Sequence, residues 1–199
     1  MAKAREFWEW FQEHEPEIRH AYLQADTSHL DDLLSLRVAN ATSGAGWEIG
    51  PYALPSHAFV FSPGNADRIS ACRELVDAAP DIPTWRFFHA KPAKDLTSLR
   101  IEVGAHEICA ERWYYRLTSY RAGEFVDVEL LFEEADSPSP ADAVLAGELL
   151  LEALLGELVF LQRVGRIEPN CVPSLAKLDR ATPLRYLRRH LDSILKPLQ

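Results

Sequence analysis

Cysteine is scarce in this sequence: there are three, at Cys72, Cys109 and Cys171, and they lie far apart. No two of them have the close, paired spacing of a zinc site or a redox motif, and three are too few for a disulfide framework. We therefore expect reduced, buried thiols and predict no metal site built on cysteine.

Glycine-rich and nucleophile motifs are also missing. The stretch Gly44-Ala45-Gly46 lacks both the third glycine and the preceding strand of a dinucleotide-binding loop. There is no nucleophile elbow and no histidine pair at metal-binding spacing on a predicted helix. We accordingly assign no catalytic, cofactor-binding or metal-ligating residue, and we expect no cofactor.

Long hydrophobic runs are absent too. The most apolar segment, Val144 to Leu161, contains Glu148, Glu152 and Glu157, so it is unsuited to crossing a bilayer. Charged residues also interrupt the apolar residues at the N-terminus, which therefore lacks the core of a secretory signal. We expect a soluble, cytoplasmic protein with no membrane partner.

Basic residues are the minority charge: 21 Lys and Arg face 30 Asp and Glu, for a formal net charge of −9. Because attraction to phosphates dominates non-specific affinity for nucleic acid, this balance argues against a nucleic-acid partner. The charge is uneven, since six basic and two acidic residues lie between Lys177 and Lys196. This basic tail either docks on the acidic body, which we favour, or forms a patch for a partner.

The hydrophobic periodicity alternates between helical and strand-like segments. Helices are expected at about 3–24 with a kink or break caused by Pro16, at 28–41 with Ser28 and Asp31 as a capping pair, and at 66–79, 139–155 and 183–195. Strands are expected at 47–50, 58–62, 85–90, 99–103, 111–134 as a hairpin, and 159–167. We predict an α+β fold in which helices pack on a mainly antiparallel sheet, two-layer or sandwich-like, as a single domain over residues 1–199.

The hairpin is the clearest element, with its turn at Ala122-Gly123. One register places Arg116 opposite Glu129 and gives the other face the apolar residues Trp113, Tyr115 and Leu117. A slip of one residue would place Tyr115 opposite Glu129. Charge pairing and burial therefore favour the first register. The helix at 139–155, apolar around most of its circumference, is expected to be the most buried helix.

Four aromatic rings occur within five residues, from Phe7 to Phe11. Phe7, Trp10 and Phe11 fit on one face of a helix, which leaves Trp8 pointing elsewhere. An exposed tryptophan flanked by carboxylates is typical of an interface anchor, so Trp8, Glu9 and Glu13 are our candidate partner-binding residues. The alternative, that Trp8 packs in the core against a neighbouring loop, is favoured on general grounds.

Three weaker patterns contain residue types used in metal binding or catalysis. The cluster His14, Glu15, Glu17 and His20 could hold a metal, but histidines six apart lie on opposite sides of a helix. Glu148 and Glu152, one turn apart, fit an acid/base pair or an exposed stripe, and the stripe is favoured. Cys109 lies near His106, as a thiol nucleophile lies near its base, but the sequence does not show the base contact and oxyanion hole that such a nucleophile needs.

Five short segments together resemble a family of uncharacterised bacterial proteins: Phe7-Trp8-Glu9-Trp10-Phe11, Trp47-Glu48-Ile49-Gly50-Pro51, Ala79-Pro80-Asp81 ahead of Trp85, Lys91-Pro92 and Leu154-Leu155-Gly156-Glu157. The resemblance implies a similar single-domain α+β fold. It carries no activity, cofactor or catalytic residue.

Two functional hypotheses remain. The first is a cytosolic protein-binding or regulatory module, of which an immunity protein that blocks a toxin is one version; it needs a protein partner, and homo-oligomerisation is left open. The second is an enzyme whose cleft uses dispersed residues such as His106, Glu107, Glu148 and Tyr115. We lean towards the module, because no catalytic motif is present.

Overall fold

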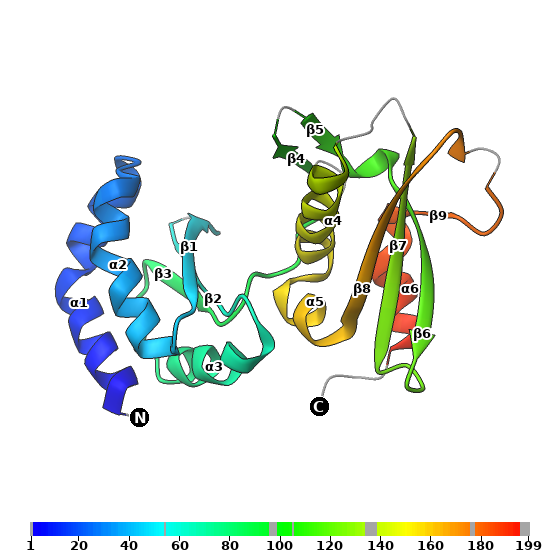
Figure 1. Cartoon of the computed structure of the whole chain (residues 1–199). Helices are drawn as coiled ribbons and strands as arrows, with labels where there is room; N and C mark the ends of the chain where they lie inside the picture. The colour runs from blue at the N-terminus through cyan, green and yellow to red at the C-terminus, as the bar shows by residue number, and fades with distance from the viewer. Residues whose placement is uncertain are drawn as a thin grey trace. The chain divides into compact units, whose positions relative to one another are not determined.

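The computed structural model describes residues 2–53, 55–95, 99–104, 106–133, 139–175 and 178–195. The chain divides into two compact units, Met1–Lys91 and Pro92–Gln199, each drawn in Figure 1. Each unit has its own cluster of buried hydrophobic residues. Whether the two units make up the single domain expected from the sequence stays a prediction.

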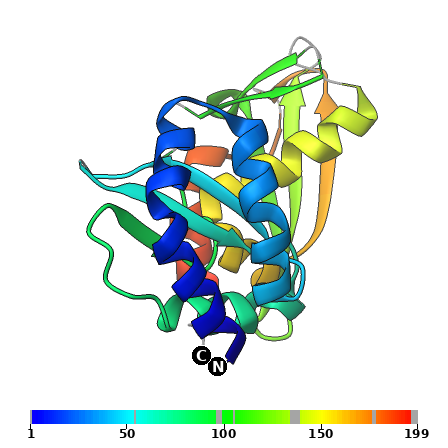
Figure 2. The ribbon, with the colours of Figure 1, turned by 90° about the vertical axis from the view of Figure 1, so that its left-hand side faces the viewer.

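Unit 1 consists of two helices, a three-stranded sheet and a third helix. In chain order these are α1 (Ala2–Leu23), α2 (Thr27–Thr42), β1 (Gly46–Pro51), β2 (His57–Ser62), the 3-10 turn η1 (Ala66–Arg68), α3 (Ile69–Asp77) and β3 (Trp85–Phe88). The sheet has the order β1-β2-β3; β1 and β2 are antiparallel, and β3 is parallel to β2. Figure 2 shows α1 and α2 side by side in front of these strands.

Local sequence signals set the ends of the unit 1 helices. The Asp26 side chain accepts a hydrogen bond from the backbone N–H of His29 at 3.1 Å, so Asp26 caps α2 and the expected Ser28–Asp31 pair is wrong. Ser43 ends α2 in the left-handed conformation, with φ of 62°. Pro16 does not break α1, which continues to Leu23.

Unit 2 begins with a small hairpin and continues with a four-stranded sheet and three helices. Its elements are β4 (Arg100–Val103), β5 (His106–Cys109), η3 (Ala110–Arg112), β6 (Tyr114–Tyr120), β7 (Phe125–Glu133), α4 (Pro140–Leu155), α5 (Glu157–Arg163), β8 (Val164–Val172), β9 (Thr182–Pro183), η6 (Leu184–Tyr186) and α6 (Leu187–Ile194). The large sheet has the order β8-β7-β6-β9, with only the β7–β8 pair parallel. The α+β fold with mainly antiparallel sheets is thus confirmed.

The β6–β7 hairpin has the predicted register. Arg116 lies opposite Glu129 and Tyr115 opposite Leu130, and the Arg116 Nη1 atom is 3.2 Å from Glu129 Oε2. On the other face Trp113 and Tyr115 are buried, and the Trp113 ring stacks on Phe132 with 4.5 Å between centroids. Glu134, the expected end of the hairpin, lies outside the described residues.

Three other predictions need correction. The expected strand at 159–167 is helical at its start, because α5 extends to Arg163 before β8 begins. The helix α4 has the largest share of buried residues among the described helices, as expected, but its solvent-facing side is wider than its apolar circumference suggested, because Val144, Leu145 and Leu149 are exposed. Cys72 is buried as expected, whereas Cys109 is half-buried and Cys171 is exposed.

The basic tail docks through its apolar residues rather than its charges. Leu184, Leu187 and Leu191 join the core of unit 2, while Arg185, Arg188 and Arg189 are exposed. Among the described residues, none of these three arginines forms an ion pair. Lys177 and Lys196, which bound the tail, lie outside the described residues.

Candidate functional site

Trp8, the central residue of the predicted partner site, is buried. Only 3% of its surface is exposed, and its indole Nε1–H donates to the carbonyl oxygen of Leu75 at 2.8 Å. Its ring packs edge-on against Phe87, with 4.5 Å between centroids. The expectation of an exposed Trp8 anchor is therefore wrong, and the core-packing alternative describes this side chain.

Trp10 is the aromatic residue of this cluster that lies at the edge of the core. It is half-buried, stacks on His14 with 5.0 Å between ring centroids, and carries the guanidinium of Arg37 over its face at 5.2 Å. The sequence suggested the reverse, because the face shared by Phe7, Trp10 and Phe11 looked continuous. The structure buries Phe7, Trp8 and Phe11 instead.

A groove nevertheless lies over Trp8, between α1 and the C-terminal end of α3. Its volume is about 710 Å³, and we call it the α1–α3 groove. Trp8, Ala4, Ala78 and Pro80 supply its apolar lining, and its polar lining is Arg5, Glu9, Gln12, Glu74 and Asp77. Glu9, one of the predicted partner-binding residues, thus lines a real hollow above the buried, hydrogen-bonded Trp8.

The α1–α3 groove is negatively charged overall, because three carboxylates line it with a single guanidinium. Arg5 Nε lies 3.2 Å from Glu9 Oε1, and both side chains are largely exposed. Glu74 accepts a hydrogen bond from the hydroxyl of Ser70 at 3.2 Å. Glu74 and Asp77 are both exposed, so two carboxylates of the groove remain open to an incoming cation.

Glu13 extends this acidic surface along α1. It is exposed and lies one helical turn beyond Glu9, so the two carboxylates share one side of the helix. Glu13 is not among the residues that line the groove. The structure therefore places Trp8 under the groove, Glu9 on its rim and Glu13 outside it.

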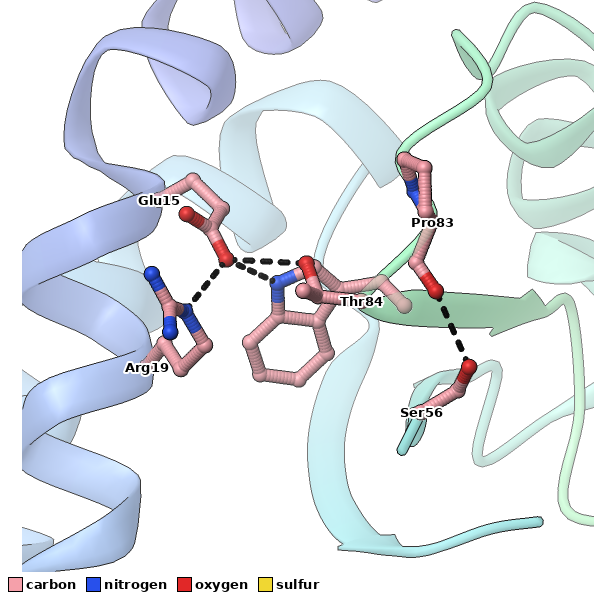
Figure 3. A network of polar contacts seen from close by, with 6 residues as sticks. Glu15, Arg19, Ser56, Pro83 and Thr84 are labelled. Atoms are coloured by element: carbon pink, nitrogen blue, oxygen red, sulfur yellow. Dashed lines mark hydrogen bonds and ion pairs between the residues drawn. The ribbon is translucent and has the colours of Figure 1, made fainter. Parts of the chain in front are cut away.

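The His14–His20 cluster is used for structural contacts. One oxygen of Glu15 accepts hydrogen bonds from Arg19, the Thr84 hydroxyl and the Trp85 indole, each at 3.0 Å, and so ties α1 to the start of β3 (Figure 3). Glu17 contacts His29 at 3.0 Å. Within the described residues no group of three or more potential ligands could hold a metal.

In the part of the chain that the structure describes, no hydrogen bond or ion pair joins the dispersed catalytic candidates to one another. Glu107 in β5 pairs with Arg100 in β4, and Glu148 is exposed on α4. Tyr115 is buried, with its hydroxyl 3.1 Å from Nδ1 of His190 in α6. His106 also lies in β5. Sequence reasoning missed His190, because its only signal was its place on a predicted amphipathic helix.

Unit 2 has a polar hollow of about 450 Å³ on the outer face and edge of its large sheet. The carboxylates that line it already have partners. Glu129 accepts hydrogen bonds from Arg116 and from Asn170, the latter at 2.9 Å, while Asp127 accepts from the backbone N–H of Arg166 at 2.8 Å. Arg166 Nη2 also lies 2.7 Å from Glu168.

No family model matches this chain, and no curated protein or solved structure matches it either. The resemblance to a bacterial family thus stays a prediction. None of the described helices has the length and apolarity that a membrane span requires.

Proposed function

We propose that this chain is a protein-binding module and that the α1–α3 groove of unit 1 binds a basic segment of a partner protein. The observation that carries the proposal is the combination of an apolar floor with a rim of three carboxylates, Glu9, Glu74 and Asp77. A lysine or arginine side chain can place its charged head on such a rim while its aliphatic stem packs on the floor.

The size and rigidity of the groove support this function. Its volume of about 710 Å³ lies within the range of roughly 300–1,000 Å³ that is typical of ligand pockets. The Trp8 indole is pinned by its hydrogen bond to Leu75, so the floor does not have to be ordered when a partner binds, and the entropic cost of binding is lower.

Charge gives the groove its selectivity. The whole chain carries a formal charge of −9, which attracts a basic partner at long range and raises the rate of encounter at low salt. The proposed setting is cytoplasmic. A small acidic protein that neutralises a basic toxin is one version of the proposal, and a regulatory subunit is another.

An enzyme is less well supported. Burial raises the pKa of Tyr115 to about 12, so its hydroxyl keeps its proton near neutral pH and cannot serve as a base there. The carboxylates of the unit 2 hollow are each held by hydrogen-bond donors or arginines. Neither observation points to a group that is ready to take up a substrate proton.

The test compares two variants of equal net charge. Glu74→Lys with Asp77→Lys reverses the open carboxylates of the groove, whereas Asp32→Lys with Asp67→Lys reverses exposed carboxylates elsewhere on unit 1. A partner captured by the wild-type protein and identified by mass spectrometry is titrated against both variants by calorimetry. The groove variant should bind it at least about tenfold more weakly, with the loss greatest at low salt. Equal binding by the two variants would overturn the proposal.

A second pair of variants examines the residues predicted from the sequence. Glu9→Gln removes a rim charge, and Glu13→Gln removes one outside the groove. We expect Glu9→Gln to weaken the captured partner's affinity by a few-fold more than Glu13→Gln, because only Glu9 lines the groove. The reverse order would place the interface farther along α1.

A further inference from the structure

The outer edge of β6 is only partly covered by β9. On one side β6 pairs with β7 along its whole length, from Tyr114 to Tyr120. On the other side, within the described part of the chain, only Tyr114 and Tyr115 pair, with Pro183 and Thr182 of β9. In Figure 1 the end of β6 next to the β6–β7 turn has β7 on one side and no strand on the other.

The direction of the backbone groups on this edge follows from one hydrogen bond. The N–H of Leu184 donates to the carbonyl oxygen of Trp113 at 2.9 Å, so Trp113 points its backbone groups towards β9. These directions alternate along a strand. Leu117 and Ser119 therefore also point their N–H and C=O groups outward, past the end of β9, whereas Arg116, Thr118 and Tyr120 point theirs towards β7.

The chain before β9 turns away from this edge. In the β6–β9 register the residue opposite Leu117 would be Arg180, but Arg180 has φ of 61°, which is left-handed and ends the extended run. The Arg116 guanidinium holds this turn by donating to the carbonyl oxygen of Asp179 at 3.1 Å. Among the described residues, the position beside Leu117 and Ser119 is thus left open.

The polar hollow of unit 2 lies at this same edge. Its lining includes Leu117, Thr118, Arg180, Thr182 and His190, and its volume is about 450 Å³. Thr118, Ser119 and Tyr120 are exposed. The open edge therefore has space beside it for the side chains of an added strand.

The charges around the edge favour an acidic strand. From Arg116 to Arg121 the sequence contains no acidic residue. Arg180 lies at one end of the open edge and Arg121, stacked over Phe125 at 5.4 Å, at the other. Within the described residues neither of these two arginines forms an ion pair, even though the exposed Asp179 and Glu124 lie close to them in sequence. The carboxylates that line the hollow, Asp127, Glu129 and Glu168, are already engaged.

We propose that the open edge of β6, from Leu117 to Tyr120, binds an extended acidic segment of a partner protein by strand addition. Backbone hydrogen bonds to Leu117 and Ser119 hold the segment, and its carboxylates lie near Arg180 and Arg121. This site is separate from the α1–α3 groove and does not rest on the function proposed for it.

A second copy of this chain fits the edge less well. In antiparallel pairing of two β6 edges, the outward-pointing Leu117 of one copy lies opposite Ser119 of the other. That register brings the Arg121 of each copy towards the Arg180 of the other, so like charges meet at both ends of a short ladder. An acidic peptide meets the same arginines with opposite charge.

Amide hydrogen exchange on the full chain tests the proposal. The probe is a short end-blocked peptide that alternates glutamate with valine. In the free protein the amides of Leu117 and Ser119 should exchange faster than those of Thr118 and Tyr120, and the peptide should slow exchange at Leu117 and Ser119. The same peptide with lysine in place of glutamate should bind at least about tenfold more weakly.

Two variants of one residue separate strand addition from other modes of binding. Ser119→Pro removes the outward N–H at a position where an edge strand tolerates proline, whereas Ser119→Ala keeps the N–H. We expect the first variant to weaken glutamate-peptide binding by about tenfold and the second to leave it unchanged. If Ser119→Pro fails to fold, Arg180→Glu serves as the second test, with a similar expected loss.

The outcomes that overturn the proposal are distinct. They are unchanged exchange at Leu117 and Ser119 in the presence of the glutamate peptide, equal binding of the lysine peptide, or protection that rises with protein concentration alone, which indicates a second copy. The groove variant Glu74→Lys with Asp77→Lys should bind the glutamate peptide as well as the wild type does. Failure of one proposal is thus distinguishable from failure of the other.

Discussion

Trp8 in α1 donates its indole N–H to the carbonyl oxygen of Leu75 in α3, across 2.8 Å and 67 positions of sequence. The last four carbonyl groups of a helix lack partners within that helix. Leu75 lies in the final turn of α3, which ends at Asp77. The indole thus satisfies a carbonyl that α3 itself leaves open and joins the first and third helices of unit 1.

This hydrogen bond predicts a graded loss of stability at Trp8. Trp8→Ala should lower the free energy of unfolding by about 3–5 kcal/mol, because it leaves a cavity under the groove. Trp8→Phe keeps most of the ring but leaves the buried carbonyl unpaired, and should cost about 1–3 kcal/mol. Urea denaturation measures both, with the exposed Tyr52→Phe as control. A neutral Trp8→Ala would contradict the burial of this side chain.

The two sides of α4 should respond differently to truncation. Leu150 and Leu154 are buried, whereas Leu145 is 46% exposed. Leu150→Ala or Leu154→Ala should cost about 2–5 kcal/mol, and Leu145→Ala, on the solvent side, should stay within about 0.5 kcal/mol. Thermal or urea unfolding measures the three variants. Losses below about 1 kcal/mol at both buried positions would show that α4 is not a core helix.

Tyr115 should ionise at a higher pH than an ordinary tyrosine. Burial raises its pKa from the ordinary 10.0 to about 12, so the unfolded chain loses this proton before the folded chain does. The stability that the buried phenol contributes is fully present below pH 10 and is lost as the pH rises through about 12. Titration of tyrosinate absorbance in the wild type and in Tyr115→Phe measures this ionisation, which should be missing from the variant near pH 12. If the variant instead loses an ionisation at lower pH, the assignment to Tyr115 is wrong.

His89 should make unit 1 less stable in mild acid. Burial and then the charge of Arg73 lower its pKa below the ordinary 6.5, although Asp77 opposes them. The unfolded chain therefore takes up a proton near pH 6.5 while the folded chain resists it, so stability falls as the pH drops below that value. His89→Gln should reduce this slope in urea unfolding at several pH values. The exposed His20→Gln is the control, and an equal reduction there would contradict the prediction.

Several features could be predicted from the sequence because they depend on near neighbours. The β6–β7 register follows from a period of two and one turn, which together place Arg116 opposite Glu129. Ser139 caps α4, as its position before Pro140 indicated, by accepting from the N–H of Asp142 at 3.2 Å. The α+β class itself needed only the alternation of helical and strand periods.

Other features could not be predicted, because their energy lies between residues far apart in the chain. The sequence favoured a strand at Val159, whose side chain suits a pleated sheet, but packing on the core of unit 2 favours α5 there. Helical periodicity also placed the wrong tryptophan in the core. It grouped Trp10 with Phe7 and Phe11 on one face of α1 and left Trp8 outside that face, whereas the structure buries Trp8 with Phe7 and Phe11.

By itself the sequence determined the α+β class, the register of the β6–β7 hairpin and the net negative charge, since each depends on composition or on residues within a turn or two. Only the tertiary structure decided that Trp8 faces Leu75, that Tyr115 meets His190 across 75 positions, and that β9 stops short along the edge of β6. Those three arrangements depend on long-range packing and on where the chain turns. The α1–α3 groove depends on the first arrangement and the open edge of β6 on the third, which is why neither surface could be predicted from the residues alone.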